Sequence, residues 1–326
     1  MKQRGMALLV VLLLLGLMAG LAADMATRFH TSLRRTGQIE TALQQRWDFR
    51  IAEDQALRIL LQDLKNNPQL NSRDQLWAQP HTLALKDGAT VIWQLRSAQD
   101  CFNLNALAHS PLQPLEEPPY SVAVFRALLE QSGVSALDAN ALTAAIADYI
   151  DSDNNARRDG AEDDSYSDKP VRYVANQPFF DVSELRAIKG MTPRLYQTLS
   201  PWLCALGSST LQIHVNTLSA YQTPLLAALF LNKQNTGNVR SLLSQTPENG
   251  WISPKQLLNA AAQAWPADKD ILSKSATGLS ATSDFYTLTL RLQHEGRTTL
   301  QRSSIYYQRK DSQLSVYART AAPDSH

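Results

Sequence analysis

The chain has 326 residues, and its 31 Lys and Arg against 30 Asp and Glu leave a net charge of +1. This balance argues against a globally basic nucleic-acid binder, and 44% apolar with 19% charged residues excludes wholesale disorder. Two cysteines are too few for a disulfide-rich scaffold or a cysteine-rich zinc site, but they allow one bridge in an oxidising compartment.

The chain opens with a short basic head and a long apolar run. Residues 1–5 read MKQRG, and residues 6–23 carry no charge, which is just long enough for a helix to cross a bilayer. Three interpretations compete. They are a buried core helix, a secretory signal cleaved after Ala22, and a leader cleaved after Gly5 that leaves the apolar run attached.

The residues after the apolar run favour the third interpretation. From Asp24 to about Leu64 there is no Pro and a single Gly, and apolar residues recur at a helical spacing until Asn66-Asn67-Pro68. A core helix is disfavoured because the run is apolar on every face, and a signal peptide is usually followed by a cap or turn. We expect one helix from Met6 to Leu64, about 90 Å long, half in lipid and half in water.

Alternating apolar and polar residues predict strands at both ends of the remaining chain. Residues 81–86 and 89–96 flank a turn at Asp87-Gly88, and residues 285–292, 298–308 and 313–318 form a second group near the end. Helical spacing fills the middle, over residues 122–131, 136–150, 182–188, 193–199, 223–231 and 254–264. A helical domain inserted into one small antiparallel sheet explains this order, so we predict an α+β fold.

Two short segments of the middle region are similar to helix-hairpin-helix elements, residues 185–191 and 213–217. In DNA-binding versions such a hairpin offers backbone N–H groups to a phosphate. Only Gly190, Lys189 and Arg194 support that use here. A membrane-tethered DNA-binding protein of an uptake apparatus is therefore the alternative function, and a tight structural turn is the simpler interpretation.

An acidic loop at residues 148–168 gives the strongest chemical signal, with eight carboxylates against two arginines. Its spacing matches the first, third, fifth, seventh and twelfth positions of a calcium loop. The predicted ligands at those positions are Asp151, Asp153, Asn155, the backbone carbonyl of Arg157, and Glu162, with Asp163, Asp164 and Asp168 as candidates for a second ion. Ala156 stands where an EF-hand has Gly, and no regular helix clearly follows, so this is not a true EF-hand. A set of hard oxygen donors favours Ca²⁺.

No catalytic constellation is apparent in the sequence. The six histidines are scattered, and no nucleophile elbow, phosphate-binding loop or dinucleotide glycine pattern is present. The paired carboxylates occur only in the acidic loop, where metal binding is the better use. We do not expect an enzyme.

The string from Arg4 to Val10, RGMALLV, resembles the leader junction of type IV pilin-like proteins. Most of that superfamily has Glu at the fifth mature position, where this chain has Val10. This departure, the length and the middle region make the chain similar to the K-type minor pseudopilins of type II secretion systems, the GspK family. The resemblance covers essentially the whole chain.

The resemblance implies a pseudopilus-tip protein needed for export of folded exoproteins. It also implies cleavage by prepilin peptidase between Gly5 and Met6, bound calcium in the acidic region, and the I-type and J-type minor pseudopilins as immediate partners before other pseudopilins, with no nucleic acid. It implies a single-pass inner-membrane protein with periplasmic soluble domains, where a Cys101–Cys204 bridge can form. The expected divisions are a leader (1–5), a transmembrane part (6–23), a periplasmic helix (24–67), a pilin-like sheet (68–104 and 276–326) and an inserted all-α domain (105–275).

Overall fold

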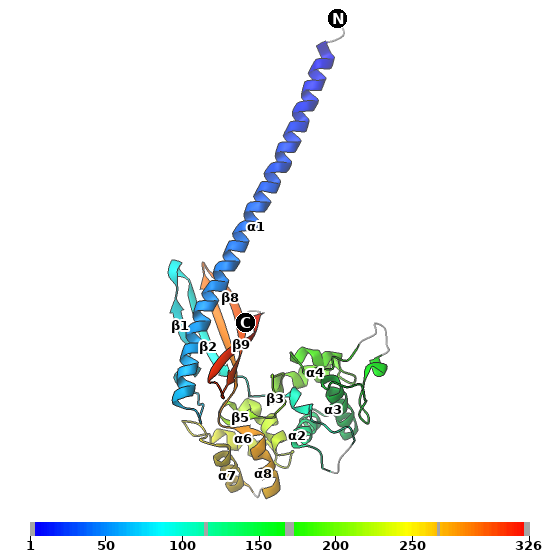
Figure 1. Cartoon of the computed structure of the whole chain (residues 1–326), viewed down its shortest axis with the longest axis vertical. Coiled ribbons are helices and arrows are strands. Elements are labelled where there is room, and N and C mark those ends of the chain that lie inside the picture. The colour runs from blue at the N-terminus through cyan, green and yellow to red at the C-terminus, as the bar shows by residue number, and fades with distance from the viewer. Residues whose placement is uncertain (1–3, 114–116, 167–172, 266–267, 323–326) are drawn as a thin grey trace.

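The computed structural model describes residues 4–113, 117–166, 173–265 and 268–322. Its first element is a single helix, α1 (Arg4–Asn66), of 63 residues. At 1.5 Å per residue this helix is about 95 Å long, and its first half projects away from the rest of the molecule (Figure 1). The continuous helix predicted from Met6 to Leu64 is confirmed.

The apolar run of α1 lies outside both hydrophobic cores. Side chains from Leu8 to Leu21 are exposed by half or more, although nearly all of them are aliphatic. Within the described ranges this is the one helix long and apolar enough to cross a membrane, with a mean hydropathy of 2.4 over its best 18-residue window. Such a segment suggests membrane anchoring.

The second half of α1 packs on a five-stranded antiparallel sheet with the strand order β1-β2-β7-β8-β9. Its strands are β1 (His81–Ala84), β2 (Thr90–Ser97), β7 (Phe285–His294), β8 (Arg297–Gln308) and β9 (Gln313–Ala322). The central pair joins the two ends of the soluble part, since Ser97 of β2 lies opposite Tyr286 of β7. One sheet is therefore built from the two predicted strand groups.

Side chains of α1 and one face of the sheet share a hydrophobic core. Phe49, Ala52, Ala56, Leu60 and Leu64 recur every three or four residues, so they form one stripe of the helix, and each is buried. Opposite them lie alternate residues of the strands: Val91, Trp93, Leu95, Leu288, Leu290, Leu292 and Ile305. The apolar stripe of the helix and the inward face of the sheet pack into one core. For this reason one side of α1 is buried from about Asp48 onwards.

A buried carboxylate also fixes α1 to the edge of the sheet. Glu53 has a side chain 1% exposed, and it accepts hydrogen bonds from Arg319 on β9 (Nη2 to Oε1, 2.8 Å) and from the hydroxyl of Ser303 on β8 (2.7 Å). Burial raises the pKa of Glu53, but the hydrogen bonds from Arg319, Ser303 and Arg50 outweigh it, so the net pKa lies below its ordinary value. The ionised carboxylate therefore ties α1 to the sheet.

Between β2 and β7 the chain forms a separate helical domain with its own core, which runs from Phe102 to Ala281. This domain lies beyond the sheet, at the end of the molecule opposite the amino terminus (Figure 1). Its helices are α2 (Tyr120–Gln131), α3 (Ala136–Ile150), α4 (Pro193–Leu199), α5 (Thr223–Leu229), α6 (Thr236–Ser244), α7 (Pro254–Ala264) and α8 (Lys269–Thr277). Two parallel pairs of two-residue strands add to them, β3 (Phe102–Asn103) with β4 (Leu203–Cys204) and β5 (Ile213–His214) with β6 (Leu279–Ser280).

Two sequence-based expectations for the insertion need correction, and two helices were missed. The segment 182–188 is a 3-10 helix over Val182–Ala187, because a capping box at Asp181 starts it and Ile188 returns to extended backbone. The proposed hairpin at 213–217 is strand β5 followed by a 3-10 turn, because Ile213 pairs with Leu279. Helices α6 and α8 were not predicted.

Candidate functional site

The acidic loop follows directly from the end of α3, and its structure is organised around one buried carboxylate. Asp148 has no exposed surface. It accepts hydrogen bonds from the backbone N–H of Arg157 (3.2 Å), from that residue's Nη1 (2.8 Å) and from the N–H of Ala161 (2.7 Å). The loop is therefore wound around the last turn of α3.

Arg157 neutralises the start of the loop. Its guanidinium, whose side chain is 8% exposed, forms ion pairs with both Asp148 and Asp151 and donates to the backbone carbonyl of Ser110 at 2.8 Å. Burial lowers the pKa of Arg157, but the hydrogen bonds that it donates to Asp151 and Asp148 raise it by more, so the net pKa lies above its ordinary value. The sequence predicted a ligand role for its carbonyl; the carbonyl accepts the N–H of Gly160 at 2.9 Å, and the side chain supplies a counter-charge that was not foreseen.

Glu162 carries an unbalanced charge. Its residue is 6% exposed, and both carboxylate oxygens are buried without a hydrogen-bond partner, as is Oδ1 of Asp151. Burial first, and then repulsion from Asp148, Asp151, Asp153 and Asp163, raises the pKa of Glu162 to about 7. Three carboxylate oxygens without a hydrogen-bond partner, in a loop rich in oxygen donors, fit a divalent cation, because such an ion would be coordinated by them and would neutralise their charge.

The remaining predicted ligands lie along the loop and are not gathered into one cluster. Asp153 accepts the N–H of Asn155 (2.8 Å), and Asp163, at the start of a 3-10 turn with Asp164, accepts the N–H of Val174 (2.9 Å). Asp168 lies outside the described residues. Within the described part of the chain no three His, Cys, Asp or Glu side chains are arranged as a metal-binding group.

Gly160 is required by the close approach of the loop to α3. A Cβ on this residue would lie 1.9 Å from Oδ2 of Asp148 and 3.1 Å from the carbonyl of Arg157. Asp148 cannot move away without losing its buried donors. The glycine is thus part of the site although no ligand pattern includes it.

The predicted disulfide is present. Cys101 and Cys204 are bonded, with their Cα atoms 5.7 Å apart and 103 positions apart in the sequence. They follow β2 and end β4, respectively, so the bridge closes the first part of the insertion, which includes the acidic loop.

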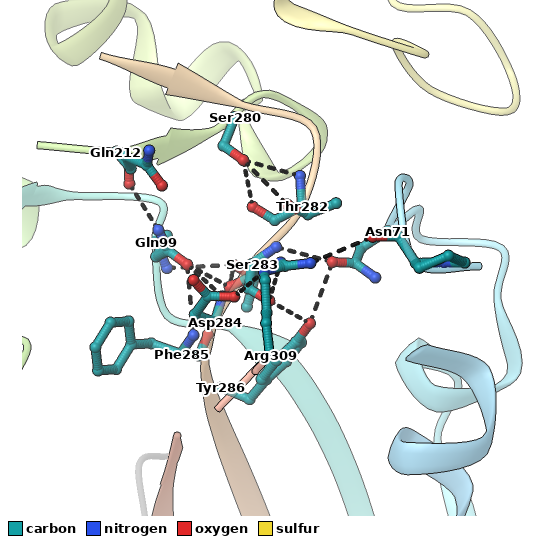
Figure 2. A network of polar contacts seen from close by, with 12 residues as sticks. Asn71, Gln99, Gln212, Ser280, Thr282, Ser283, Asp284, Phe285, Tyr286 and Arg309 are labelled. Carbon is teal, nitrogen blue, oxygen red and sulfur yellow. Dashed lines mark hydrogen bonds and ion pairs between the residues drawn. The ribbon is translucent and has the colours of Figure 1, made fainter. Parts of the chain in front are cut away.

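A buried polar network connects the insertion to the sheet, and sequence analysis missed it (Figure 2). Oδ1 of Asn71 accepts the N–H of Ser283 at 2.8 Å, and Oε1 of Gln99 accepts the Ser283 hydroxyl (2.8 Å) and the N–H of Asp284 (2.7 Å). Arg309 forms an ion pair with Asp284 and donates to the Ser283 carbonyl at 3.1 Å. The chain leaves the sheet for the insertion here, after β2, and returns here before β7, and the contacts of the network are buried or half-buried. The network therefore fixes the orientation of the insertion relative to the sheet. Isolated Asn, Gln and Ser residues in loops carry no pattern that would reveal it.

The residues of the predicted processing site lie at the start of α1. The helix begins at Arg4 and continues through Gly5 and Met6, and Met6 is 70% exposed. Cleavage between Gly5 and Met6 stays a prediction.

A long amino-terminal helix half-covered by a small antiparallel sheet, with a helical domain between two sheet strands, defines a pilin-like protein with a large insertion. Two family models described as "Type II secretion system (T2SS), protein K" match residues 100–208 and 213–277. The chain belongs to the type II secretion system protein K family, also called the GspK family.

Known relatives match over nearly the whole chain. A protein of Escherichia coli (strain K12), provisionally named type II secretion system protein K, is 42% identical over 320 residues, or 98% of each chain. The type II secretion system protein K of Aeromonas hydrophila is 35% identical over 326 residues, 98% of this chain and 97% of that one. A chain in the crystal structure of the GspK-GspI-GspJ complex from enterotoxigenic Escherichia coli superimposes with a TM-score of 0.77 at 32% identity, covering 89% of this chain and 100% of that chain.

These comparisons settle the functional class. The chain is a minor pseudopilin that acts at the tip of the pseudopilus of a type II protein secretion system. The DNA-binding alternative is not supported, in agreement with the absence of a hairpin at residues 213–217.

Proposed function

We propose that this chain caps the periplasmic pseudopilus as one copy, with the I-type and J-type minor pseudopilins as immediate partners. The observation that carries the proposal is the placement of the helical domain at the end of the molecule opposite the membrane-anchoring segment (Figure 1). A domain of this size on the free end leaves no room for a further subunit above it. The role is structural and not catalytic. Support for the partners comes from the similarity to a chain solved in a complex with GspI and GspJ.

The residue at position 10 supports the same position in the filament. After cleavage at Gly5, the new amino group at Met6 enters an apolar helix bundle, where an unpaired charge is expensive. The amino group can pair with a Glu of the subunit below. Val10, exposed by 53% on α1, offers no carboxylate to a subunit above. A subunit that can bind a neighbour only below itself occupies the end of the filament.

The stoichiometry of purified pseudopili tests the capping role. We expect about one copy of this chain per filament, together with one each of the I-type and J-type proteins, crosslinked at one end. Recovery of this chain as a repeated subunit along the shaft would contradict the proposal. A Val10→Glu variant is the matched test, because it restores the missing carboxylate; we expect it to permit subunits above this chain only if the insertion is removed as well.

We also propose that prepilin peptidase removes residues 1–5. Before it enters the filament, the mature protein is a single-pass inner-membrane protein with its soluble part in the periplasm. The short basic head and the unbroken α1 beyond the apolar run support this. Mass spectrometry of the mature chain should give Met6 as the first residue. A chain that begins near Ala23 would show that a secretory signal is removed instead.

We further propose that the acidic loop binds Ca²⁺, with Asp151, Asp153, Asn155, the Arg157 carbonyl and Glu162 as ligands and Asp163, Asp164 and Asp168 as candidates for a second ion. The orphaned oxygens of Glu162 and Asp151 support it. Saturating calcium should raise the melting temperature of the full chain, and exhaustive chelation should lower it.

A Glu162→Gln variant separates calcium binding from simple repulsion. Without calcium this variant should be as stable as the wild type or more so, because it removes a buried, unpaired charge. It should lose the stabilisation that calcium gives the wild type. The control is Glu130→Gln, which removes an exposed carboxylate of α2 from the same domain. Equal melting curves of the wild type with calcium and with chelator would exclude a structural ion.

A further inference from the structure

The insertion contains a pocket of defined chemistry next to the acidic loop, and among the described residues Asp159 is the one carboxylate of that loop that lines it. The pocket has a volume of about 430 Å³ and lies between α2, α3, residues 110–112 and 118, and the outer side of the loop at residues 157–159. This volume is within the usual range for small-ligand sites, about 300–1,000 Å³. Its apolar walls include Pro111, Leu112, Val122 and Leu137.

An uncompensated guanidinium forms one wall of this pocket. Arg126 of α2 is half-buried, and it makes no hydrogen bond or ion pair with any described residue; its Nε is buried without a partner. Burial lowers the pKa of Arg126, and no carboxylate of the described residues opposes the effect. Arg157 on the neighbouring wall provides the contrast, since two aspartates neutralise it. A cation that is desolvated without a counter-ion is costly unless a ligand supplies the counter-ion.

The other polar groups of the pocket are consistent with an anionic ligand. Arg158 also lines it without an ion pair among the described residues, and Asp159 is the one carboxylate among the described lining residues. The hydroxyl of Ser110 is buried and has no hydrogen-bond partner there. A guanidinium binds a planar carboxylate through two parallel hydrogen bonds, whereas an inorganic anion would gain nothing from the apolar walls.

We propose that this pocket binds a carboxylate attached to an apolar group of a few carbon atoms, with Arg126 as the residue that pairs with the carboxylate. The carboxylate can belong to a protein segment or to a small free acid, and the chemistry is the same in both cases. The inference is independent of calcium binding and of the number of copies in the filament, because it uses no residue of the predicted ligand set except the wall formed by Arg157.

The test uses the purified full chain in detergent, at a fixed calcium concentration, with binding followed by isothermal titration calorimetry or ligand-observed NMR. The first pair of compounds is N-acetyl-leucine and N-acetyl-leucinamide, which share an apolar group and differ in the charge. The second pair is a short peptide that ends in a free leucine carboxylate and its amidated form. Tighter binding of the peptide acid would identify a protein segment as the ligand; tighter binding of N-acetyl-leucine would identify a small acid.

We expect each acid to bind at least tenfold more tightly than its amide, because a hydrogen bond to a charged group contributes about 1.5–3 kcal/mol. Arg126→Gln should weaken the acids by a similar factor and leave the amides unchanged. Arg126→Lys should retain part of the preference, and Arg240→Gln, on the exposed surface of α6, should behave as the wild type. Because Arg126 has no partner to lose, the Gln variant should melt at or above the wild-type temperature, which separates lost binding from unfolding.

Two results would overturn the proposal. One is equal affinity of acid and amide for the wild type, and this includes no detectable binding of either at about 10 mM. The other is an unchanged preference for the acid in a folded Arg126→Gln variant. Failure here leaves the tip role intact, since filament stoichiometry measures that role separately.

Discussion

Removal of the Cys101–Cys204 bridge should destabilise the protein by an amount that the length of the closed loop determines. The bridge joins residues 103 positions apart. In the chain-entropy model a loop of this length lowers the entropy of the unfolded chain by about 16 cal/mol/K, or about 4.7 kcal/mol at 25 °C. At about 2–4 °C per kcal/mol for a domain of this size, the melting temperature should fall by about 9–19 °C.

The assay compares the free energy of unfolding in urea for the wild type, Cys101→Ala, Cys204→Ala and the double variant. The bridge is lost as soon as one cysteine is removed, so the three variants should agree with one another and with the reduced wild type to within the small cost of each side chain. Non-reducing alkylation of the denatured wild type should detect no thiol, because no cysteine is free in the described structure.

The reasoning would be refuted by a common loss below about 1 kcal/mol, since the unfolded chain would then gain little freedom from an open loop. Unequal single variants would show instead that side-chain packing at one cysteine dominates. Calcium should be held constant throughout, because the closed loop contains the acidic segment.

Three further predictions follow from buried contacts. Glu53→Gln should lower the free energy of unfolding at pH 7 by about 1–3 kcal/mol. Because the folded-state pKa of Glu53 lies below the ordinary 4.5, the wild type should lose stability as the pH drops below about 4.5, and the variant should lose less. Gly160→Ala should cost about 2–4 kcal/mol or abolish folding of the loop, because its Cβ would overlap Asp148. The control is Gly207→Ala, whose Cβ would have its nearest neighbour at 3.9 Å; its free energy of unfolding in the same urea titration should be nearly that of the wild type. Asn71→Ala should leave the buried N–H of Ser283 without an acceptor, while the Tyr286 hydroxyl keeps its bond to the Ser283 carbonyl; it should cost about 1–3 kcal/mol, with faster hydrogen exchange in the residues that link the insertion to the sheet.

Elements with strong periodicity were predictable from the sequence. Helices α3, α4 and α7 begin and end where the pattern placed them, because Ser135, Thr192 and Ser253 are capping residues and apolar residues follow at helical spacing. The five strands of the main sheet were also found; in β2, β7 and β8 buried residues alternate with more exposed ones, which is the pattern that predicts a strand. Helices α6 and α8 are short and have few buried residues, so their pattern is weak.

The candidate site was predictable in composition but not in arrangement. The oxygen spacing from Asp151 to Glu162 is a property of the sequence. The arrangement depends on how the loop folds over α3. In the folded loop Arg157 turns inward and neutralises Asp148, and neither carboxylate oxygen of Glu162 has a hydrogen-bond partner. Contacts between residues far apart in the chain, such as Arg319 with Glu53 and Asn71 with Ser283, have no local signature at all.

The pairing of β2 with β7 has a consequence for the order of folding. The last residue of β2 is Ser97 and the first of β7 is Phe285, so the whole core of the insertion, from Phe102 to Ala281, leaves the ribosome before the three strands that complete the sheet, β7, β8 and β9. At 5–20 residues per second this interval lasts on the order of 10–40 s. During it, the helical domain can already close on itself while the apolar stripe of α1 from Phe49 to Leu64 has no sheet to cover it. The part of the molecule that joins the filament is therefore finished last, and a chain cut off before residue 285 should keep a folded cap on an aggregation-prone stem.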